Sequence, residues 1–99
     1  MPQITTFRSN LISKGYDVVA GTPLVFPGST SRDYFMVTNL DAAKDIEVAF
    51  GKNPVAADFF KISAGGFFEP AFTPTGDITI KSVSATTSVV VLTDAHNSV

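Results

Sequence analysis

Apolar and polar residues alternate along several short stretches of this chain. Residues 45–50 read DIEVAF and residues 77–81 read DITIK, so that an apolar side chain occupies every second position. Successive side chains of a β-strand point to opposite faces, and a period of two is therefore typical of strands with one buried face. The pattern predicts a fold built from strands.

Turn-forming residues separate these stretches, for example PGSTS at 27–31, Gly65–Gly66 and PTG at 74–76. Seven to nine short strands at this spacing predict an all-β protein, a single antiparallel β-sandwich with either jelly-roll or immunoglobulin-like topology. The predicted strands cover residues 16–20, 24–26, 33–39, 45–50, 59–62, 67–72, 77–83 and 87–93.

Local signals predict how some of these strands are connected. A short polar link joins residues 33–39 to residues 45–50, which indicates a hairpin. Asn53 and Pro54 suit the cap and the first position of a helix, so we expect one helical turn at 53–58.

The 99 residues are expected to form one domain, because no linker or repeat divides them. Residues 1–11 are predicted to form an N-terminal arm, and residues 94–99 a loose C-terminal tail.

Several strands carry more large apolar side chains than one buried face can accommodate. Residues 34–37 and 89–92 are apolar on both faces, and the pair Phe67–Phe68 places one ring on each side. Central strands, or strands covered by loops, would account for this surplus. Alternatively, the outward residues form an apolar patch that contacts another subunit. In this second interpretation the candidate interface residues are Tyr34, Met36, Phe59, Phe67, Val89 and Val91.

Composition and charge weigh against several classes of function. The absence of cysteine excludes a disulfide framework and a cysteine-ligated zinc site. The net charge is −2 and the lysines are scattered, whereas nucleic-acid binding requires clustered basic residues. Apolar runs are far shorter than the ~20 residues that span a bilayer, and the N-terminus does not resemble a signal peptide. We therefore expect a protein made in the cytoplasm, with neither nucleic acid nor membrane as a partner.

Few residues offer catalytic or metal-binding chemistry. The single histidine, His96, lies close to the C-terminus, where a loose tail could not hold it against a nucleophile. Asp94 and His96 alone would make a weak metal site, and Asp41, Asp45 and Glu47 lack the spacing of a calcium-binding loop and are expected to be solvated. We expect no catalytic residue, no metal site and no cofactor.

Arg32 precedes the predicted strand at 33–39. The usual role of an arginine at such a position is a surface salt bridge worth about 0–1 kcal/mol. We predict this role for Arg32.

The order of several segments along the chain is similar to that of a known class of protein. These segments are PGSTSR at 27–32, YFMVTN at 34–39, DIEVAF at 45–50, ISAGGFFE at 62–69, GDITIKS at 76–82 and SVVVL at 88–92. Over residues 24–93 the order resembles small β-sandwich structural proteins of tailed bacteriophages, which are capsid decoration (cement) proteins or fibre and tail accessory proteins. The resemblance implies a protein without catalysis, present in many copies on a virion, and it carries over no binding residue.

The predicted function is that of a non-enzymatic virion structural protein, a capsid decoration (cement) protein that binds and stabilises the phage shell as a homo-oligomer. The resemblance favours a trimer, with the major capsid protein or another virion protein as partner. The alternative is a carbohydrate- or receptor-binding module of a tail or fibre. The absence of tryptophan weighs against this alternative, because sugar sites favour exposed aromatic platforms.

Overall fold

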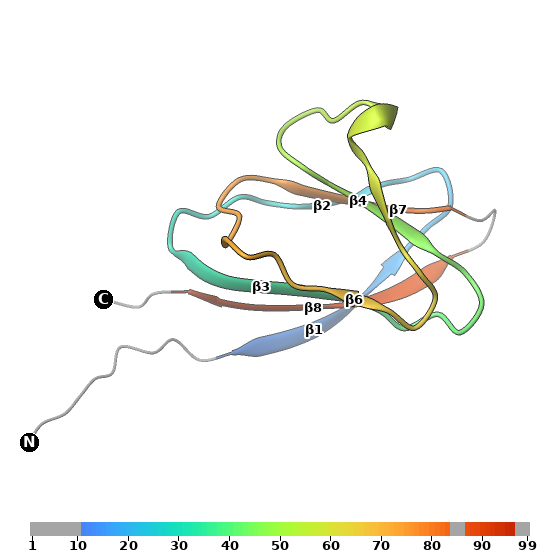
Figure 1. The fold of residues 1–99 in the computed structure, drawn as a ribbon, viewed down its shortest axis with the longest axis horizontal. Coiled ribbons are helices and arrows are strands. Elements are labelled where there is room, and N and C mark those ends of the chain that lie inside the picture. The colour runs from blue at the N-terminus through green and yellow to red at the C-terminus, as the bar shows by residue number, and fades with distance from the viewer. Residues whose placement is uncertain (1–10, 84–86, 97–99) are drawn as a thin grey trace, which may run out of the picture.

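The computed structural model describes residues 11–83 and 87–96. Its strands form two four-stranded antiparallel sheets that face each other (Figure 1). A single turn of 3-10 helix, η1 (Ala56–Asp58), lies outside the sheets. No helix in these residues is long and apolar enough to cross a membrane. The strands are β1 (Ile12–Val18), β2 (Leu24–Phe26), β3 (Arg32–Asn39), β4 (Ile46–Phe50), β5 (Phe60–Ile62), β6 (Phe67–Phe68), β7 (Ile78–Ser82) and β8 (Ser88–His96).

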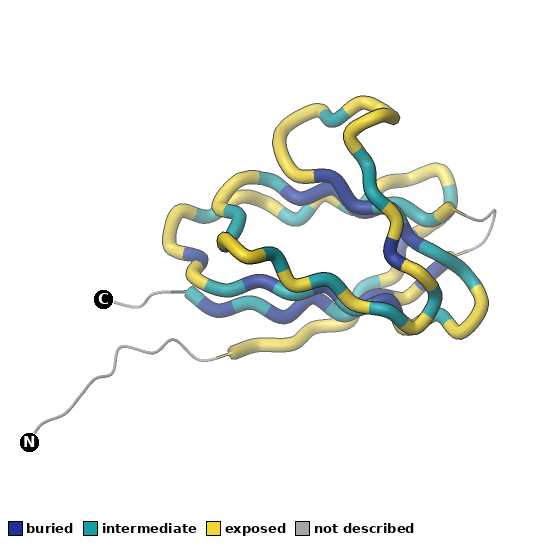
Figure 2. Tube along the Cα trace, viewed as in Figure 1, coloured by how far each residue is buried: buried dark blue, intermediate teal, exposed yellow. Residues whose placement is uncertain are grey.

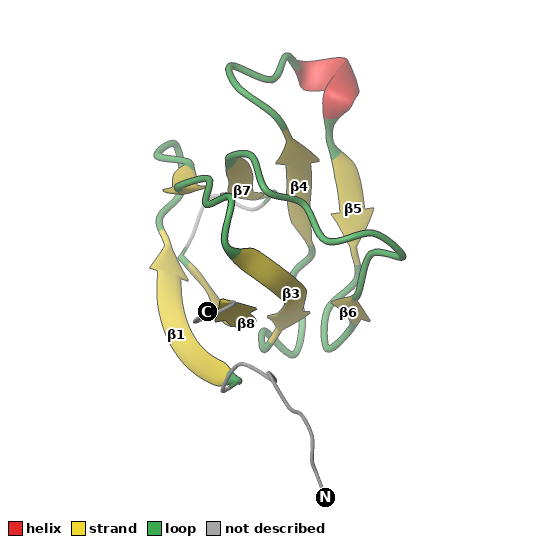
Figure 3. Cartoon of the chain, turned by 90° about the vertical axis from the view of Figure 1, so that its left-hand side faces the viewer, coloured by secondary structure: helices red, strands yellow, loops and turns green. Residues whose placement is uncertain are grey.

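The strand order is that of a jelly roll. One sheet has the order β1-β8-β3-β6 and the other the order β2-β7-β4-β5. Figure 3 shows the sandwich end-on, with β1, β8, β3 and β6 on one side and β7, β4 and β5 on the other. Consecutive strands lie in opposite sheets except for β4 and β5, which pair with each other. The first two strands of an immunoglobulin domain share a sheet, so the predicted sandwich is confirmed with jelly-roll topology.

β3 and β4 do not form the predicted hairpin. β3 pairs with β8 and β6, whereas β4 pairs with β7 and β5 in the other sheet. The buried side chain of Asn39 helps to direct the crossing, because its amide donates to the carbonyls of Lys44 at 2.8 Å and Ser63 at 3.2 Å. Its Oδ1 accepts the backbone N–H of Asp41 at 3.0 Å. These bonds satisfy the polar groups of the link at the end of the sandwich.

The core fills the space between the sheets. Figure 2 shows buried residues mainly on the strands in the middle of each sheet, and exposed residues in the loops and along β1. The predicted alternation holds for Ile46, Glu47 and Val48 of β4, but not for the end of the strand. Ala49 is fully buried, and Phe50 is exposed at the rim of the core, against Phe60 and Phe68. The residues of the core are Val18, Phe35, Val37, Ile46, Val48, Ile62, Ile78, Ile80, Val90 and Leu92.

The C-terminal end is more ordered than the sequence suggests. β8 extends to His96, so residues 94–96 are not the predicted loose tail. Asp94 pairs with Ile12 of β1 and with Phe35 of β3, and strands on both sides therefore hold this segment. Residues 97–99 and residues 1–10 of the predicted arm lie outside the described residues.

Other element boundaries also differ from the prediction. β6 contains only two residues, because Pro70 cannot donate a hydrogen bond to a sheet. β1 begins at Ile12 rather than at residue 16. The predicted helical turn within 53–58 is confirmed as η1, but its predicted start is wrong: the residue that caps η1 is Val55, not Asn53, and Asn53 has a φ of 52°.

Candidate interaction surface

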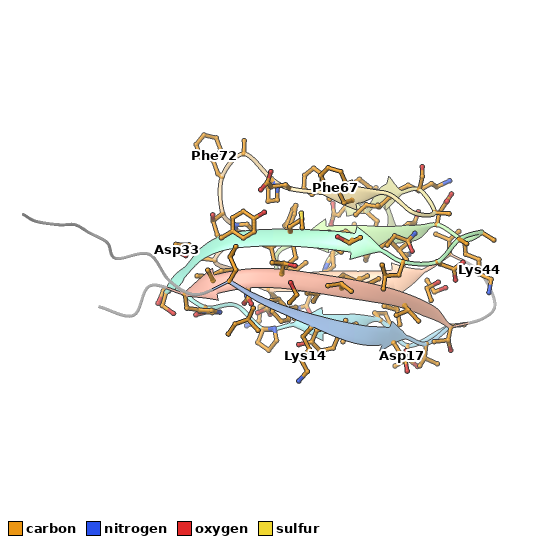
Figure 4. The ribbon with its side chains drawn as sticks, turned by 90° about the horizontal axis from the view of Figure 1, so that it is seen from below. Lys14, Asp17, Asp33, Lys44, Phe67 and Phe72 are labelled. Carbon is orange, nitrogen blue, oxygen red and sulfur yellow. The ribbon has the colours of Figure 1, made fainter. Side chains whose placement is uncertain are left out.

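The outward side of the β1-β8-β3-β6 sheet presents an apolar surface to solvent (Figure 4). In β3 the side chains of Phe35, Val37 and Asn39 are buried, so the alternate residues point outward. The pairing of β3 with β8 and β6 extends this alternation across the sheet. We call the outward residues of these three strands the apolar face: Tyr34, Met36, Thr38, Phe67, Val89, Val91, Thr93 and Ala95. Thr93 and Ala95 are covered by their neighbours and buried, and the other six are partly or fully exposed.

The strand register brings most of the predicted interface residues together on this face. Thr38 pairs with Phe67 on one side and with Val91 on the other, and Met36 pairs with Thr93. Five of the six candidates, all except Phe59, therefore lie on one side of one sheet. Phe67 is 66% exposed and is the most accessible of them.

Phe59 lies elsewhere and is not part of the apolar face. It comes directly before β5, in the wall of a groove on the other sheet that also includes Val25 and Thr79. The ammonium nitrogen of Lys81 lies 4.2 Å from the centre of its ring. Phe59 points outward as the sequence suggests, but alternation cannot tell which sheet a residue belongs to.

Charges lie mainly at the margins of the apolar face. Among the described strands of this sheet, the charged residues that do not face the core are Asp17 of β1 and Asp33, which is exposed at the irregularity between Arg32 and Tyr34 in β3. Figure 4 places Asp17, Asp33 and Lys44 towards the ends of the strands. The hydroxyl of Tyr34 donates a hydrogen bond to Glu69, and this bond raises the pKa of Tyr34. The centre of the face is therefore apolar and its rim is polar.

A separate polar group surrounds Arg32 and the end of β8. Arg32 is buried, which corrects the prediction of a surface salt bridge. Its guanidinium donates to the carbonyls of Pro27 at 2.6 Å, Pro74 at 2.7 Å and Gly76 at 3.3 Å. Burial lowers the pKa of Arg32, while the nearby carboxylates partly oppose this shift. Arginine remains protonated under all ordinary conditions, so Arg32 is a buried cation that joins two loops.

His96 is held in place beside this cation and is not on a solvated tail. Its Nε2 lies 2.8 Å from Oδ2 of Asp94, and its Nδ1 lies 3.2 Å from Oγ of Ser29 and 3.0 Å from Oγ of Ser31. When Nε2–H donates to Asp94, Nδ1 can accept a hydrogen bond from a serine hydroxyl. Sequence reasoning missed this group, because its members come from segments more than 60 residues apart.

A serine beside a histidine and a carboxylate is also the arrangement of an activated nucleophile. Acyl transfer requires, in addition, N–H donors that stabilise an oxyanion. In the same loop, the N–H of Gly28 donates to Asp77 Oδ1 at 2.7 Å, and the N–H of Ser29 donates to the carbonyl of Thr75 at 2.8 Å. Because these donors are engaged, the group is better suited to tie the loop to the end of β8.

No protein-family model matches the chain, and no curated protein sequence matches it. Among solved structures, the cupin domain of Schizosaccharomyces pombe Cnp3 has a TM-score of 0.60 at 19% identity, over 95% of this chain and 61% of that chain. The chain thus spans about three fifths of that structure. A structure described under "Bacillus endospore appendages form a novel family of disulfide-linked pili" has a TM-score of 0.48 at 13% identity, over 98% of this chain and 96% of that chain. The likeness to the Cnp3 domain shows the fold alone, that of a small β domain, and neither title names a phage protein.

Proposed function

We propose that this protein is a non-enzymatic structural protein that binds its own copies and a virion shell through the apolar face. The apolar face is the observation that carries the proposal. Protein interfaces commonly have an apolar centre within a polar rim, and the apolar face has this arrangement. The specific role, a capsid decoration protein, rests on the phage resemblance of residues 24–93.

The size of the apolar side chains explains how such a surface could bind. Phe67 is 66% exposed and Val89 is 41% exposed, and association would remove this area from water. Each square ångström of apolar area buried contributes about 25 cal/mol. In an oligomer, several modest contacts act together, because the first contact raises the effective concentration of the others. A homo-oligomer, with a trimer favoured, would therefore hold a shell firmly with weak individual contacts.

Mass spectrometry of density-purified particles from the source tests the proposal directly. The measurement is the copy number of this protein relative to the major shell protein. A ratio near one copy per shell subunit is the expected result. A few copies per particle would contradict the decoration role and indicate a vertex, tail or fibre protein. Absence from particles would contradict the virion assignment altogether.

A further inference from the structure

The described strands form two sheets whose edge strands are β1, β6, β2 and β5, and the last three are poor templates for a further strand. β6 has two residues and is soon followed by Pro70, β5 has three residues, and β2 has three residues between Pro23 and Pro27. Short strands and prolines prevent sheets from pairing edge to edge. β1 has neither protection, because it contains seven residues and no proline and pairs with β8 without a register shift. Figure 4 shows β1 along the outer edge of its sheet.

The hydrogen bonds of the sheet show which backbone groups of β1 face this edge. The carbonyl of Val89 in β8 accepts the N–H of the residue that follows β3, at 3.0 Å, so the backbone groups of Val89 point towards β3. Backbone groups alternate in direction along a strand, and those of Val90 therefore point to its partner in β1, Tyr16. No other described strand lies beside β1. The residues whose N–H and C=O groups face the open edge are Ser13, Gly15 and Asp17.

The open edge is complementary to a second copy of itself. Gly15 is the middle residue of the strand, so an antiparallel pair that is symmetric about Gly15 uses all of β1. In this register Gly15 lies opposite its own counterpart, and Ser13 lies opposite Asp17. The backbone groups that face the edge thus meet one another. Each of the three residue pairs exchanges two hydrogen bonds, which gives about six bonds between the copies.

The side chains match in the same register. On the outward side, the hydroxyl of Ser13 can donate to the carboxylate of Asp17 in the other copy. On the inward side, Lys14 lies opposite Tyr16 of the other copy, and an ammonium beside an aromatic ring is favourable. The ammonium of Lys14 already lies 5.6 Å from the centre of the Tyr16 ring in its own chain. A lysine on an edge strand discourages pairing when it faces a like charge, and this register avoids placing Lys14 opposite itself.

We propose that two copies of this chain pair through β1, antiparallel and symmetric about Gly15, so that their sheets become continuous. The two-fold axis is perpendicular to the sheet, and the apolar faces of the two copies therefore lie on the same side. The proposal does not depend on the proposed function, since the edge of β1 is separate from the apolar face and the pairing requires no virion. The contact is small, so we expect a weak dimer with a dissociation constant of about 1 mM.

A concentration series of NMR spectra tests the pairing. The sample is the ¹⁵N-labelled Phe67→Ser variant, in which contacts through the apolar face are weakened, at about 0.05–2 mM. We expect saturable shifts at the amides of Ser13, Gly15 and Asp17, whose N–H groups gain acceptors, and smaller shifts at the alternate residues, which stay bonded to β8. No shift at these three amides would overturn the proposal. Shifts confined to the outward residues of β3 and β8 would also overturn it and would indicate a contact through the apolar face.

Mixed isotope labelling tests the register. In a mixture of ¹³C-labelled and unlabelled chains, an isotope-filtered NOE arises only between copies. Opposite residues that are not hydrogen-bonded have the closest Cα atoms, about 4.5 Å apart. We therefore expect an NOE from Hα of Lys14 in one copy to Hα of Tyr16 in the other. An NOE between the Hα atoms of two Lys14 residues, or of two Tyr16 residues, would show a different register and contradict the assignment.

Two substitutions of Gly15 separate the loss of its N–H from the addition of a side chain. The φ of Gly15 is not positive, and a Cβ there would meet only the carbonyl oxygen of Val90, at an ordinary contact distance of 3.9 Å. Gly15→Pro removes the central donor of the contact and no hydrogen bond to β8, and proline is tolerated at such an edge position. Gly15→Ala keeps the donor.

Dimerisation should weaken at least about tenfold in Gly15→Pro and change less than about threefold in Gly15→Ala, as measured by the same concentration series. The dispersion of the amide spectrum shows that each variant is folded. Equal dissociation constants of the two folded variants would contradict the pairing. If Gly15→Pro does not fold, the NOE between Lys14 and Tyr16 decides the question in its place.

Discussion

Arg32 contributes to this fold as a buried cation. Its guanidinium joins the loop after β2 to the loop before β7 through three backbone carbonyls, and lies 5.0 Å from the centre of the Phe26 ring. When one member of a buried charged network is removed, its former hydrogen-bond partners stay buried without a partner. This lowers the free energy of unfolding more than the loss of a surface ion pair does.

Arg32→Gln should therefore lower the free energy of unfolding by about 3–5 kcal/mol, because three carbonyls lose a charged donor and nearby carboxylates lose a cation. Urea denaturation measures this change. Lys61→Gln serves as the control, since its exposed ion pair with Asp45 should contribute less than about 1 kcal/mol. Similar losses in both variants would show that the buried network contributes little to stability.

Asp41 stabilises the link between β3 and β4. Its Oδ1 accepts the N–H of Ala43 at 2.9 Å and the N–H of Lys44 at 3.0 Å. The hydrogen bond from Ala43 is the main reason why the pKa of Asp41 is lowered. Asp41 was expected to be only a solvated loop residue, and the structure shows that its carboxylate closes a turn.

A lowered pKa in the folded state means that the unfolded state takes up the proton first as the pH falls. The stability due to the Asp41 carboxylate is present above the ordinary aspartate pKa of about 4 and is lost as the pH falls through the lower folded value. Asp41→Asn keeps an acceptor oxygen but cannot titrate. The wild type should lose more stability than Asp41→Asn between pH 7 and pH 3, as measured by urea midpoints. Equal losses would contradict this role.

At the scale of elements, the loop after β2 packs directly against the loop before β7. The N–H of Ser29 donates to the carbonyl of Thr75, and a Cβ added at Gly28 would lie 2.8 Å from that same oxygen. This approach is close enough that only glycine fits without movement of the backbone. Sequence reasoning identified the turn at 27–31 but not its contact with the other loop.

Gly28→Ala should destabilise the protein by about 1–3 kcal/mol, the usual effect of an extra group in a filled space. Gly76→Ala is the matched control, because a Cβ at Gly76 would have no heavy atom within 4 Å. Urea denaturation of the two variants provides the comparison. Equal stability of the two would show that the loops separate easily.

The predicted N-terminal arm precedes an edge strand. Among the described residues β1 pairs only with β8, and Leu11 directly before it is 64% exposed. Residues 1–10 lie outside the described residues, and their role therefore remains a prediction. A β-prone segment next to a sheet edge can add a strand to the sheet of a neighbour.

Deletion of residues 2–11 should weaken binding to virion particles, because a contact between neighbours would be lost. Co-sedimentation with particles measures this binding. Deletion of residues 97–99 at the other terminus is the control and should bind normally. Unchanged particle binding of the arm deletion would exclude the arm as a contact.

At the scale of the whole molecule, the two sides of the β1-β8-β3-β6 sheet differ in character. The outward side of the β1-β8-β3-β6 sheet carries the apolar face, and its inward side contributes to the core. The two sides differ because adjacent residues on a strand point in opposite directions.

Phe67→Ser should shift the protein from oligomer to monomer, because it removes the most exposed aromatic ring of the apolar face. Phe72→Ser is the matched control, since Phe72 is 88% exposed but lies in the loop after β6. Sedimentation velocity at several concentrations measures the change. A monomeric wild type, or equal dissociation of both variants, would contradict the role of the apolar face.

The sequence alone determined the fold class and the direction of most strand residues. Alternation is a local property, and it correctly placed Ile46, Val48 and Ile80 inside and Phe67 outside. The turn at Gly65–Gly66 was predictable for the same reason, since Gly65 has a φ of 75° that favours glycine.

Only the tertiary structure decided which strands share a sheet. Hydrogen-bonded pairing joins residues far apart in sequence, and alternation carries no information about the partner. The sequence therefore predicted a hairpin where β3 and β4 cross between sheets, and it grouped Phe59 with residues of the opposite sheet. The same long-range pairing buried Arg32 and placed His96 beside Ser29 and Ser31. The chain thus determined which side chains point outward, and the folding of distant segments against each other determined which of them form a surface or a site.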